Sequence, residues 1–278
     1  MGGKIILITG ATSGIGRHAA LYLAGQGHRV FATGRRTDAL RELEAEAGDL
    51  PIEALELDVN DDESIAAAAA KVAARTEGYG LDVLINNAGY GKFGPVALVD
   101  EAEMRGQFET NVFGLVKVTQ AFLPAMRKRG SGRVINVSSM VGRVALVLQG
   151  VYCATKHAVE ALSDCMRREV AGFGVRVILV EPGMIRSNFE STSGSDMSVY
   201  DDDPIYGPAV RRYAEEVNRM YRFAPGPRPI SRTIARAVSA RRPRARYVSP
   251  SYNAIVLFFM RILPTRLADA IFRKVAGL

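Results

Sequence analysis

The fold of this chain is decided near its start, by residues 4–16, which read KIILITGATSGIG. An apolar run typical of a buried strand leads directly into a glycine-rich loop, and the loop opens a helical pattern. Gly10, Gly14 and Gly16 let the backbone turn tightly and approach a pyrophosphate, whose charge is favoured at the amino end of a helix. The spacing is G-x-x-x-G-x-G, not the commoner G-x-G-x-x-G. Because tight packing alone can use the same glycines, the loop indicates a nucleotide site without proving one.

Strand-like and helical patterns alternate along the chain. Apolar runs that predict strands buried on both faces lie at residues 4–9, 29–33, 52–58, 81–86, 133–138 and 175–181. Helical patterns lie between and after them, at residues 15–24, 38–47, 62–75, 101–129 and 152–173. Strands that alternate with helices of this length need right-handed crossovers and form a parallel sheet. The sequence therefore predicts a doubly wound α/β fold of the Rossmann type, with residues 1–250 in one domain.

The last third of the chain departs from this alternation. Residues 184–228 begin with a long polar stretch, and because such stretches in compact domains are usually functional, we expect a substrate flap there. A helix is expected at residues 230–241 and an edge strand at residues 245–249. Residues 251–278 combine an apolar stripe with basic side chains and predict a helical tail. This tail lies either at a membrane surface or folded over the substrate cleft or a neighbouring subunit.

The cysteines and histidines exclude several classes of protein. Cys153 and Cys165 are too far apart on one predicted helix to form a disulfide, so a reduced, cytoplasmic protein is expected. His18, His28 and His157 do not stand at ligand spacing, so no metal site is expected. The apolar run at the start is too short for a signal peptide, so neither an export signal nor an N-terminal anchor is expected.

Positive charge is concentrated toward the C-terminal end. The net charge is +7, from 36 Lys or Arg against 29 acidic residues, yet residues 222–278 contain twelve Arg or Lys and one acid, Asp269. The preceding body is therefore mildly acidic, and a nucleic-acid partner is not expected. The basic segment is either a solvated face or a surface attracted to anionic lipid.

The end of the second predicted strand selects the cofactor. An acidic residue there binds the ribose hydroxyls of NAD, whereas an arginine accommodates the 2′-phosphate of NADP. Residues 33–36 read TGRR, and no acid follows before Asp38. Because the guanidinium of Arg35 would bind a phosphate that an acid would repel, NADP is favoured over NAD. The alternative is that both arginines are ordinary surface residues at the start of a helix.

A tyrosine and a lysine four residues apart are candidates for the chemistry. Tyr152 and Lys156 share one face near the start of a predicted helix, so the phenol and the ammonium point into the same space. Lowering a phenol pKa from about 10 to near 7 needs about 4 kcal/mol of preferential phenolate stabilisation, which an ammonium and an oxidised nicotinamide can supply. Ser138 and Ser139 end the preceding strand, where side chains face the ligand crevice of an open sheet. Alone, a Tyr-x-x-x-Lys pattern is usually only a helix surface.

Together these motifs resemble the short-chain dehydrogenase/reductase family, and the match extends from Lys4 to about Ser187. It consists of TGATSGIG from Thr9, Asp58-Val59, Asn86-Asn87-Ala88-Gly89, Asn111, Ser139, the Tyr152/Lys156 pair and Pro182-Gly183. As a whole, the sequence is similar to the branch of this family that contains hydroxysteroid and retinol dehydrogenases. The resemblance implies an NADP(H)-dependent enzyme that interconverts a ketone or aldehyde and an alcohol by hydride transfer.

The resemblance also implies a role for each residue. Tyr152 would be the general acid/base, Ser139 would polarise the substrate carbonyl or alcohol, and Lys156 would lower the phenol pKa and bind the nicotinamide ribose. Asn111 would hold a water that links Lys156 to solvent. The cofactor would be bound by Gly10, Ser13, Gly14, Ile15, Gly16, Arg35, Asp58, Val59, Asn87, Ala88, Gly89, Tyr152, Lys156, Pro182, Gly183, Ile185 and Ser187, with Asp58 and Val59 at the adenine and Ile185 and Ser187 at the carboxamide. Ser187 stands where the family more often has Thr, and Ser138 competes with Ser139 for the serine role.

The substrate is expected to be lipophilic. The flap and the segment after Ser139 supply mostly apolar side chains, such as Met197, Tyr213 and Leu148, and large apolar pockets with few polar anchors suit such ligands. Many of these side chains could instead belong to the core or to a subunit interface. Two rival functions stay open: a catalytically silent nucleotide-binding sensor, and an epimerase or dehydratase on the same scaffold. A homo-dimer or homo-tetramer is expected, with the tail as the candidate for peripheral membrane contact.

Overall fold

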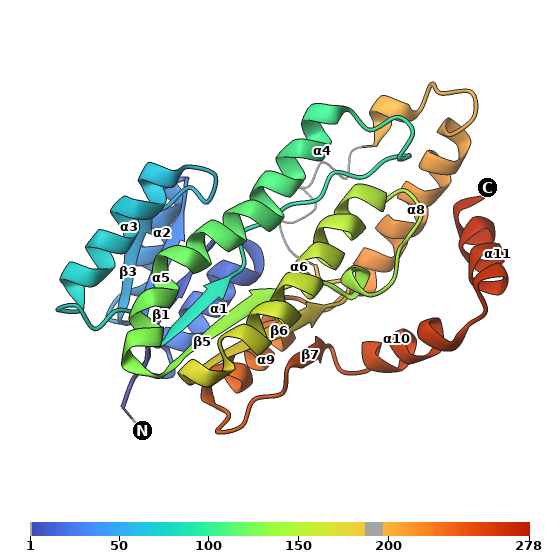
Figure 1. Cartoon of the computed structure of the whole chain (residues 1–278). Coiled ribbons are helices and arrows are strands. Elements are labelled where there is room, and N and C mark those ends of the chain that lie inside the picture. Colours follow the sequence, from blue (N-terminus) through green and yellow to red (C-terminus); the bar gives the residue numbers. More distant parts are fainter. Residues whose placement is uncertain (1, 187–196) are drawn as a thin grey trace.

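One sheet runs through the centre of the computed structural model, which describes residues 2–186 and 197–278 (Figure 1). Its strands are β1 (Ile5–Ile8), β2 (Arg29–Gly34), β3 (Ile52–Glu56), β4 (Val83–Asn86), β5 (Gly132–Val137), β6 (Val175–Pro182) and β7 (Arg246–Ser249). They stand in the order β3-β2-β1-β4-β5-β6-β7, and all neighbouring pairs are parallel. The order reverses between β1 and β4, which confirms the doubly wound prediction. Ligands of such sheets bind at this reversal, beyond the carboxyl ends of the strands.

Alternating side chains of each central strand fill two cores. In β1, Ile6 and Ile8 are fully buried on one face of the sheet and Leu7 on the other. Residues 83–85 of β4 repeat this pattern. Because successive residues of a strand point to opposite faces, an unbroken apolar run becomes a strand that is covered on both sides.

Two layers of helices cover the sheet. The helices are α1 (Gly14–Ala24), α2 (Thr37–Ala47), α3 (Asp62–Arg75), α4 (Glu101–Phe108), α5 (Leu115–Arg129), α6 (Gly150–Glu169), α8 (Gly207–Phe223), α9 (Arg228–Ser239), α10 (Asn253–Ile262) and α11 (Thr265–Ala276). α1, α2 and α9 pack on one face, while α3, α5 and α6 pack on the other. The helix expected at residues 230–241 is α9, and the expected edge strand is β7, parallel to β6.

The single long helix predicted over residues 101–129 is interrupted. It is divided into α4 and α5 by a π-helical turn, Glu109–Gly114. Gly114 passes so close to Val59 that a Cβ atom there would lie 2.8 Å from the Val59 carbonyl oxygen. The turn places Asn111 inside the molecule, where only 1% of it is exposed. π-Helical turns occur frequently at functional sites, and hydrophobic periodicity does not reveal them.

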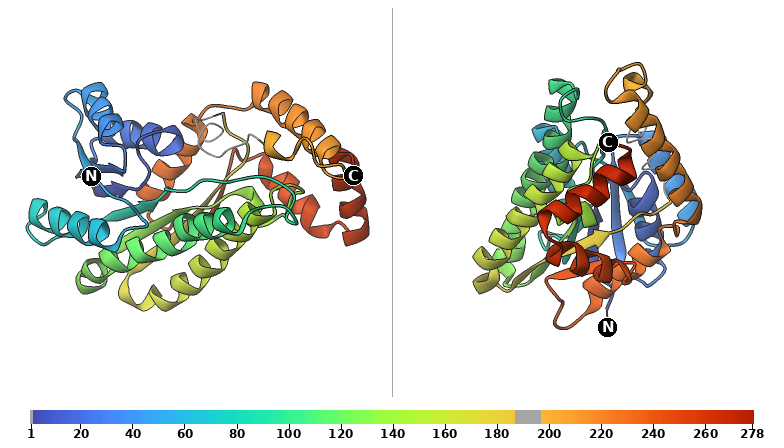
Figure 2. Two further views of the ribbon diagram at one scale, coloured as in Figure 1. Left: turned by 90° about the horizontal axis from the view of Figure 1, so that it is seen from above. Right: turned by 90° about the vertical axis from the view of Figure 1, so that its right-hand side faces the viewer.

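The C-terminal tail folds back onto the body as α10 and α11. α10 contacts β7, and α11 lies beside α8, where Arg212 donates a hydrogen bond of 3.3 Å to the carbonyl oxygen of Lys274 (Figure 2). Leu257 and Ala276 are buried by this packing, whereas Phe258 is 61% exposed. Within the described residues, none of the helices has both the length and the apolar character required to span a membrane.

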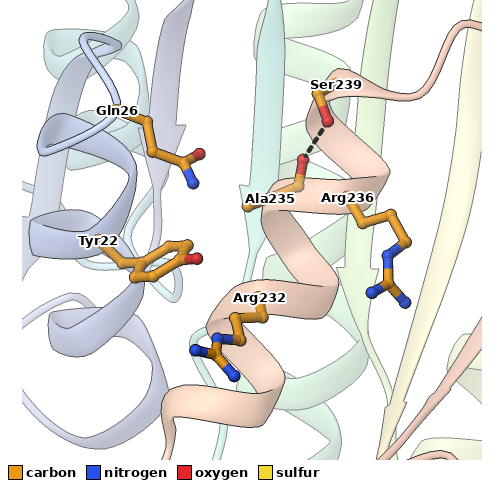
Figure 3. A pocket seen from close by; sticks show the side chains of 6 residues that line it. All are labelled: Tyr22, Gln26, Arg232, Ala235, Arg236 and Ser239. Carbon is orange, nitrogen blue, oxygen red and sulfur yellow. Dashed lines mark hydrogen bonds between the residues drawn. The ribbon is translucent and has the colours of Figure 1, made fainter.

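A hollow of about 480 Å³ lies between α1 and α9 (Figure 3). Its lining residues are Tyr22, Gln26, Arg232, Ala235, Arg236 and Ser239. The Ser239 hydroxyl within it donates to the Ala235 carbonyl oxygen at 2.9 Å, which is a bond internal to α9. Because the hollow contains no predicted site residue, the candidate site lies elsewhere, at the carboxyl edge of the sheet.

Candidate active site

The glycine loop after β1 is fastened to the loop after β4. The hydroxyl of Thr9 accepts hydrogen bonds from the backbone amides of Asn87 and Ala88, both at 2.9 Å. The side-chain amide of Asn87 donates to the carbonyl oxygens of Thr9 and Gly10, at 3.0 and 3.2 Å. A Cβ atom on Gly10 would lie 2.8 Å from Cα of Ala88, and one on Gly16 would collide with the Gly10 carbonyl. The predicted residues Gly10, Gly16, Asn87 and Ala88 are therefore brought together, with no room for larger side chains.

The amino end of α1 opens toward a second hollow. Ser13 has an extended backbone, Gly14 has a φ of +54°, and no side chain caps the helix. The hollow, of about 400 Å³, is lined by Thr12, Ser13, Gly14, Arg17, Arg36, Ala39 and Glu42. An uncapped helix amino end beside guanidinium groups favours an anionic ligand.

The two arginines after β2 point to different partners. Nη1 of Arg35, whose side chain is 69% exposed, lies 3.8 Å from Oδ2 of Asp58. Nη2 of Arg36 lies 3.2 Å from Oγ1 of Thr12 in the glycine loop. Arg36 was not among the predicted cofactor residues. The sequence does not distinguish two adjacent arginines. The backbone direction at the start of α2 determines which of them faces the glycine loop.

Asp58 and Val59 lie beyond the end of β3, at the same edge of the sheet. The carboxylate of Asp58 accepts a hydrogen bond of 2.9 Å from the backbone amide of Asn60, and its own amide donates to the hydroxyl of Ser64 at 2.9 Å. Val59 is buried and contacts Gly114. The residues expected at an adenine are thus next to the arginines and near the π-helical turn.

Tyr152 and Lys156 are both buried on the first turns of α6. The Lys156 ammonium donates a hydrogen bond of 3.1 Å to the carbonyl oxygen of Val137 and lies 5.7 Å from the centre of the Tyr152 ring. Ser139, at the end of β5, is hydrogen-bonded to the Tyr152 phenol. The spacing of four residues on one helix and the position at a strand end bring these three groups together.

Burial shifts the acidity of both groups. Burial raises the pKa of the Tyr152 phenol above its ordinary value, and the hydrogen bond with Ser139 opposes this increase. Burial also lowers the pKa of Lys156 to about 8, opposed by the negative charge of Glu160. The chain's own groups thus keep the phenol protonated near neutral pH, and a phenolate there needs a further positive charge nearby.

Asn111 connects the π-helical turn to α6 by hydrogen bonding. Its amide donates to the carbonyl oxygen of Tyr90 at 2.7 Å and to the hydroxyl of Thr155 at 3.1 Å, and its oxygen accepts from the Tyr90 amide at 2.9 Å. A Cβ atom on Gly89 would lie 2.8 Å from this oxygen and 3.7 Å from Nζ of Lys156. Asn111 and Gly89 therefore lie close to Lys156, while the water held by Asn111 and the cofactor contact of Gly89 stay predictions.

The end of β6 closes the site on the other side. The carbonyl oxygen of Pro182 accepts from the hydroxyl of Ser139 at 3.5 Å, and the amide of Gly183 donates to the carbonyl oxygen of Ser249 in β7 at 2.8 Å. Ile185 is buried in the core under α1 and α9. Ser187 lies outside the described residues.

A cluster of charged residues, largely buried, lies beside α6. Nε of Arg246 lies 3.0 Å from Glu160 and 3.3 Å from Glu181, and its Nη2 lies 2.8 Å from Asp164. Arg143 approaches the other oxygen of Glu181 at 3.4 Å. Burial and the charge of Glu160 raise the pKa of Glu181 to about 7. No sequence motif indicates this cluster, because its members come from four separate segments of the chain.

The described residues contain no group of side chains that could hold a metal ion.

Residues 4–198 match the model of a family described as short chain dehydrogenase. Human 17-beta-hydroxysteroid dehydrogenase type 1 is 36% identical over 97% of this chain and 82% of its own length. Among solved structures, a short-chain dehydrogenase from Streptomyces avermitilis is 34% identical, with a TM-score of 0.79 over 99% of this chain and 98% of its own. A serine dehydrogenase complexed with NADP+ is 29% identical, with a TM-score of 0.76 over 88% of this chain and 93% of its own. The resemblance drawn from the motifs is confirmed: the chain belongs to the short chain dehydrogenase family of oxidoreductases.

Proposed function

We propose that the chain is an NADP(H)-dependent oxidoreductase that interconverts a ketone or aldehyde and an alcohol on a lipophilic substrate, with Tyr152 as general acid/base. The observation that supports this most strongly is the juxtaposition of Ser139, Tyr152 and Lys156 beside the glycine loop. A proton donor, a hydrogen-bonding hydroxyl and a buried cation are the groups that reduction of a carbonyl requires.

The loop and the helix end fit a dinucleotide. Gly10 and Gly16 leave no room for a Cβ atom because Ala88, Asn87 and the Gly10 carbonyl pack against them, and this close packing would leave the backbone amides at the amino end of α1 open to a ligand. The arginines Arg35 and Arg36 and the hollow beside Ser13 fit the extra phosphate of NADP. A bound dinucleotide supplies the hydride, and the residues expected to hold it are those of the glycine loop, the Asn87–Gly89 loop and Lys156.

The protonation states support the phenol as the proton donor in reduction. With its pKa raised by burial, Tyr152 is protonated at neutral pH and can pass its proton to the carbonyl oxygen as negative charge develops there. Ser139 would hydrogen-bond the same oxygen. Lys156 would stabilise the phenolate that remains, because its ammonium lies near the phenol ring.

The surroundings of Tyr152 support a lipophilic substrate. Tyr152 belongs to an apolar cluster with Phe93, Val141, Leu148, Cys153, Met197, Val210, Tyr213 and Val217. Several predicted lining residues are therefore grouped around the phenol, whereas Val199, Ile205 and Phe223 are strongly exposed. On this wall the side-chain amide of Gln149 donates a hydrogen bond to the Tyr213 hydroxyl at 2.7 Å, and the other side chains of the cluster are mostly apolar, which leaves few anchors for polar ligands. That a similar protein is a hydroxysteroid dehydrogenase is consistent with this proposal.

Cofactor titration followed by a substrate screen tests the proposal. We expect NADPH to bind more tightly than NADH, and lipophilic ketones to be reduced with loss of NADPH absorbance. Cofactor binding without turnover of any carbonyl or alcohol would favour a nucleotide sensor. Conversion of substrate without net change of the cofactor would favour an epimerase or dehydratase. Assembly as a homo-dimer or homo-tetramer and a cytoplasmic location remain proposals, which gel filtration with light scattering and cell fractionation would test.

A further inference from the structure

One residue of the C-terminal tail reaches the catalytic edge of the sheet. Asn253, the first residue of α10, is only 8% exposed, although Phe258 and other large side chains of that helix are open to solvent. A Cβ atom on Gly183 would collide with Nδ2 of Asn253 and would lie 2.9 Å from its Cγ. The same Cβ atom would lie 3.0 Å from Sδ of Met140, the residue after Ser139. Asn253 therefore packs against the backbone of Gly183 within the candidate site.

The end of the sheet fixes this position. Pro182 of β6 pairs with Ser249 of β7, and the Gly183 amide donates to the Ser249 carbonyl oxygen at 2.8 Å. The chain then turns at once, and the amide of Asn253 donates to the carbonyl oxygen of Pro250 at 3.1 Å. The hydroxyl of Ser139 contacts the carbonyl oxygen of Pro182 at 3.5 Å. Ser139 and Asn253 thus both contact the Pro182-Gly183 pair, from different segments of the chain.

Within the described ranges 2–186 and 197–278, the hydrogen bonds of Asn253 involve its backbone and not its side-chain amide, and the polar atoms of that amide are not among the fully buried unpartnered ones, so a ligand can reach them. A side-chain amide that solvent can reach binds water in the free protein and can exchange that water for a polar group of a ligand. An amide offers a donor and an acceptor but no charge. The partner that fits it is a neutral polar group, such as a hydroxyl or a carbonyl oxygen.

We propose that Asn253 is a specificity-determining residue, whose amide hydrogen-bonds a second polar group of the substrate near the reacting carbon. The inference rests on the proposed function, since Ser139 and Tyr152 define where that carbon lies. The substrate class is a hydroxy- or oxo-substituted ketone, or the corresponding alcohol, with an apolar remainder against the Tyr152 cluster. The tail is then part of the substrate site, although the glycine loop and the catalytic residues all precede it.

Reduction of cyclohexanone and of its 2-, 3- and 4-hydroxy derivatives by NADPH tests this proposal. The quantity measured is kcat/KM for the best hydroxy derivative divided by kcat/KM for cyclohexanone. Asn253→Leu keeps the size of the side chain and removes its polar atoms, and we expect it to lower this ratio about 10- to 100-fold. Tyr252→Phe, a change at the exposed preceding residue, is the matched control and should leave the ratio unchanged.

Two further measurements separate specificity from misfolding. The Kd of NADPH and the melting temperature of Asn253→Leu should stay close to those of the unchanged protein. An equal loss on all four ketones, or a loss confined to NADPH affinity, would overturn the proposal. If the unchanged protein reduces none of the four ketones, calorimetry measures the binding of the same compounds to NADP+-loaded protein instead. Failure of the proposed function is decided separately, by the substrate screen described above. Equal affinities of the unchanged protein and Asn253→Leu for all four compounds would then overturn the role of Asn253.

Discussion

Replacing Arg35 by Asp and, separately, Arg36 by Asp should weaken NADPH binding far more than NADH binding. Arg35 lies 3.8 Å from Asp58 and Arg36 lies 3.2 Å from Thr12 in the glycine loop, so both guanidinium groups stand at the ribose end of the expected cofactor site. Arg35→Asp would also leave two carboxylates side by side, because Asp58 would lose its cation. NADH has no 2′-phosphate, so its affinity should change little.

The size of the effect follows from Coulomb's law. One pair of unit charges about 4 Å apart contributes about 1 kcal/mol in water and about 4 kcal/mol at an effective dielectric constant of 20. A phosphate monoester has a charge of about −1.5 to −2 at neutral pH, and an Arg-to-Asp change reverses the sign of its neighbour. Because these side chains are exposed, we take the value in water, about 1 kcal/mol per pair; the phosphate charge and the reversed sign multiply it to about 3–4 kcal/mol, and screening by salt lowers the effect to about 2–3 kcal/mol. This corresponds to about a 30- to 150-fold loss of NADPH affinity.

Fluorescence titration of each variant with NADPH and NADH measures this effect. Arg41→Asp is the matched control, because Arg41 is an exposed arginine of the adjacent helix α2 whose ion pair, at 3.3 Å, is with Asp38. We expect it to change the ratio of the two affinities by less than about 3-fold. The variant with the larger loss identifies the arginine that binds the phosphate. A ratio that stays unchanged in both Arg35→Asp and Arg36→Asp would refute the assignment of NADP.

Three further predictions concern other parts of the molecule. The kcat/KM of carbonyl reduction should fall as the pH rises through about 8, where Lys156 loses its proton. Glu160→Gln should move this decrease to lower pH, because the charge of Glu160 raises the pKa of Lys156. An identical pH profile in the variant would contradict the assignment of the decrease to Lys156. Glu181 has a folded-state pKa of about 7, above the usual 4.5, so its contribution to folding stability is present below pH 4.5 and is lost as the pH rises toward 7. The melting temperature should therefore decrease less between pH 4.5 and 7 in Glu181→Gln than in the unchanged protein. Equal decreases in the two proteins would contradict the raised pKa of Glu181. The basic tail with its exposed Phe258 and Phe259 should bind anionic liposomes in flotation at low salt and release them at high salt, and equal flotation of a chain truncated before Ser251 would exclude this role.

The fold and the centre of the site could be predicted because their signals are local. Ile6, Leu7 and Ile8 form a continuous apolar run, and such a run in an alternating chain indicates a strand covered on both sides. Tyr152 and Lys156 stand one helical turn apart, so their proximity follows from helix geometry alone.

Other features could not be predicted, because they depend on contacts between distant segments. The π-helical turn that places Asn111 inside leaves the apolar periodicity almost unchanged, and it lies where Gly114 packs closely against Val59, a residue far away in the sequence. The burial of Asn253 results from the pairing of β7 with β6, which is a contact between residues far apart in sequence. The choice between Arg35 and Arg36 likewise depends on the side chain that the start of α2 turns toward Thr12.

Single-turnover reduction by Tyr152→Phe tests the central claim most directly. The variant keeps the ring among its apolar neighbours and removes only the hydroxyl that Ser139 contacts, so folding and NADPH affinity should be nearly unchanged. Loss of a general acid typically costs about 10²- to 10⁴-fold in rate, and we predict a decrease of that size in the rate at which bound NADPH is oxidised by a lipophilic ketone. Oxidation of bound NADPH by the variant at the rate of the unchanged protein would contradict the account.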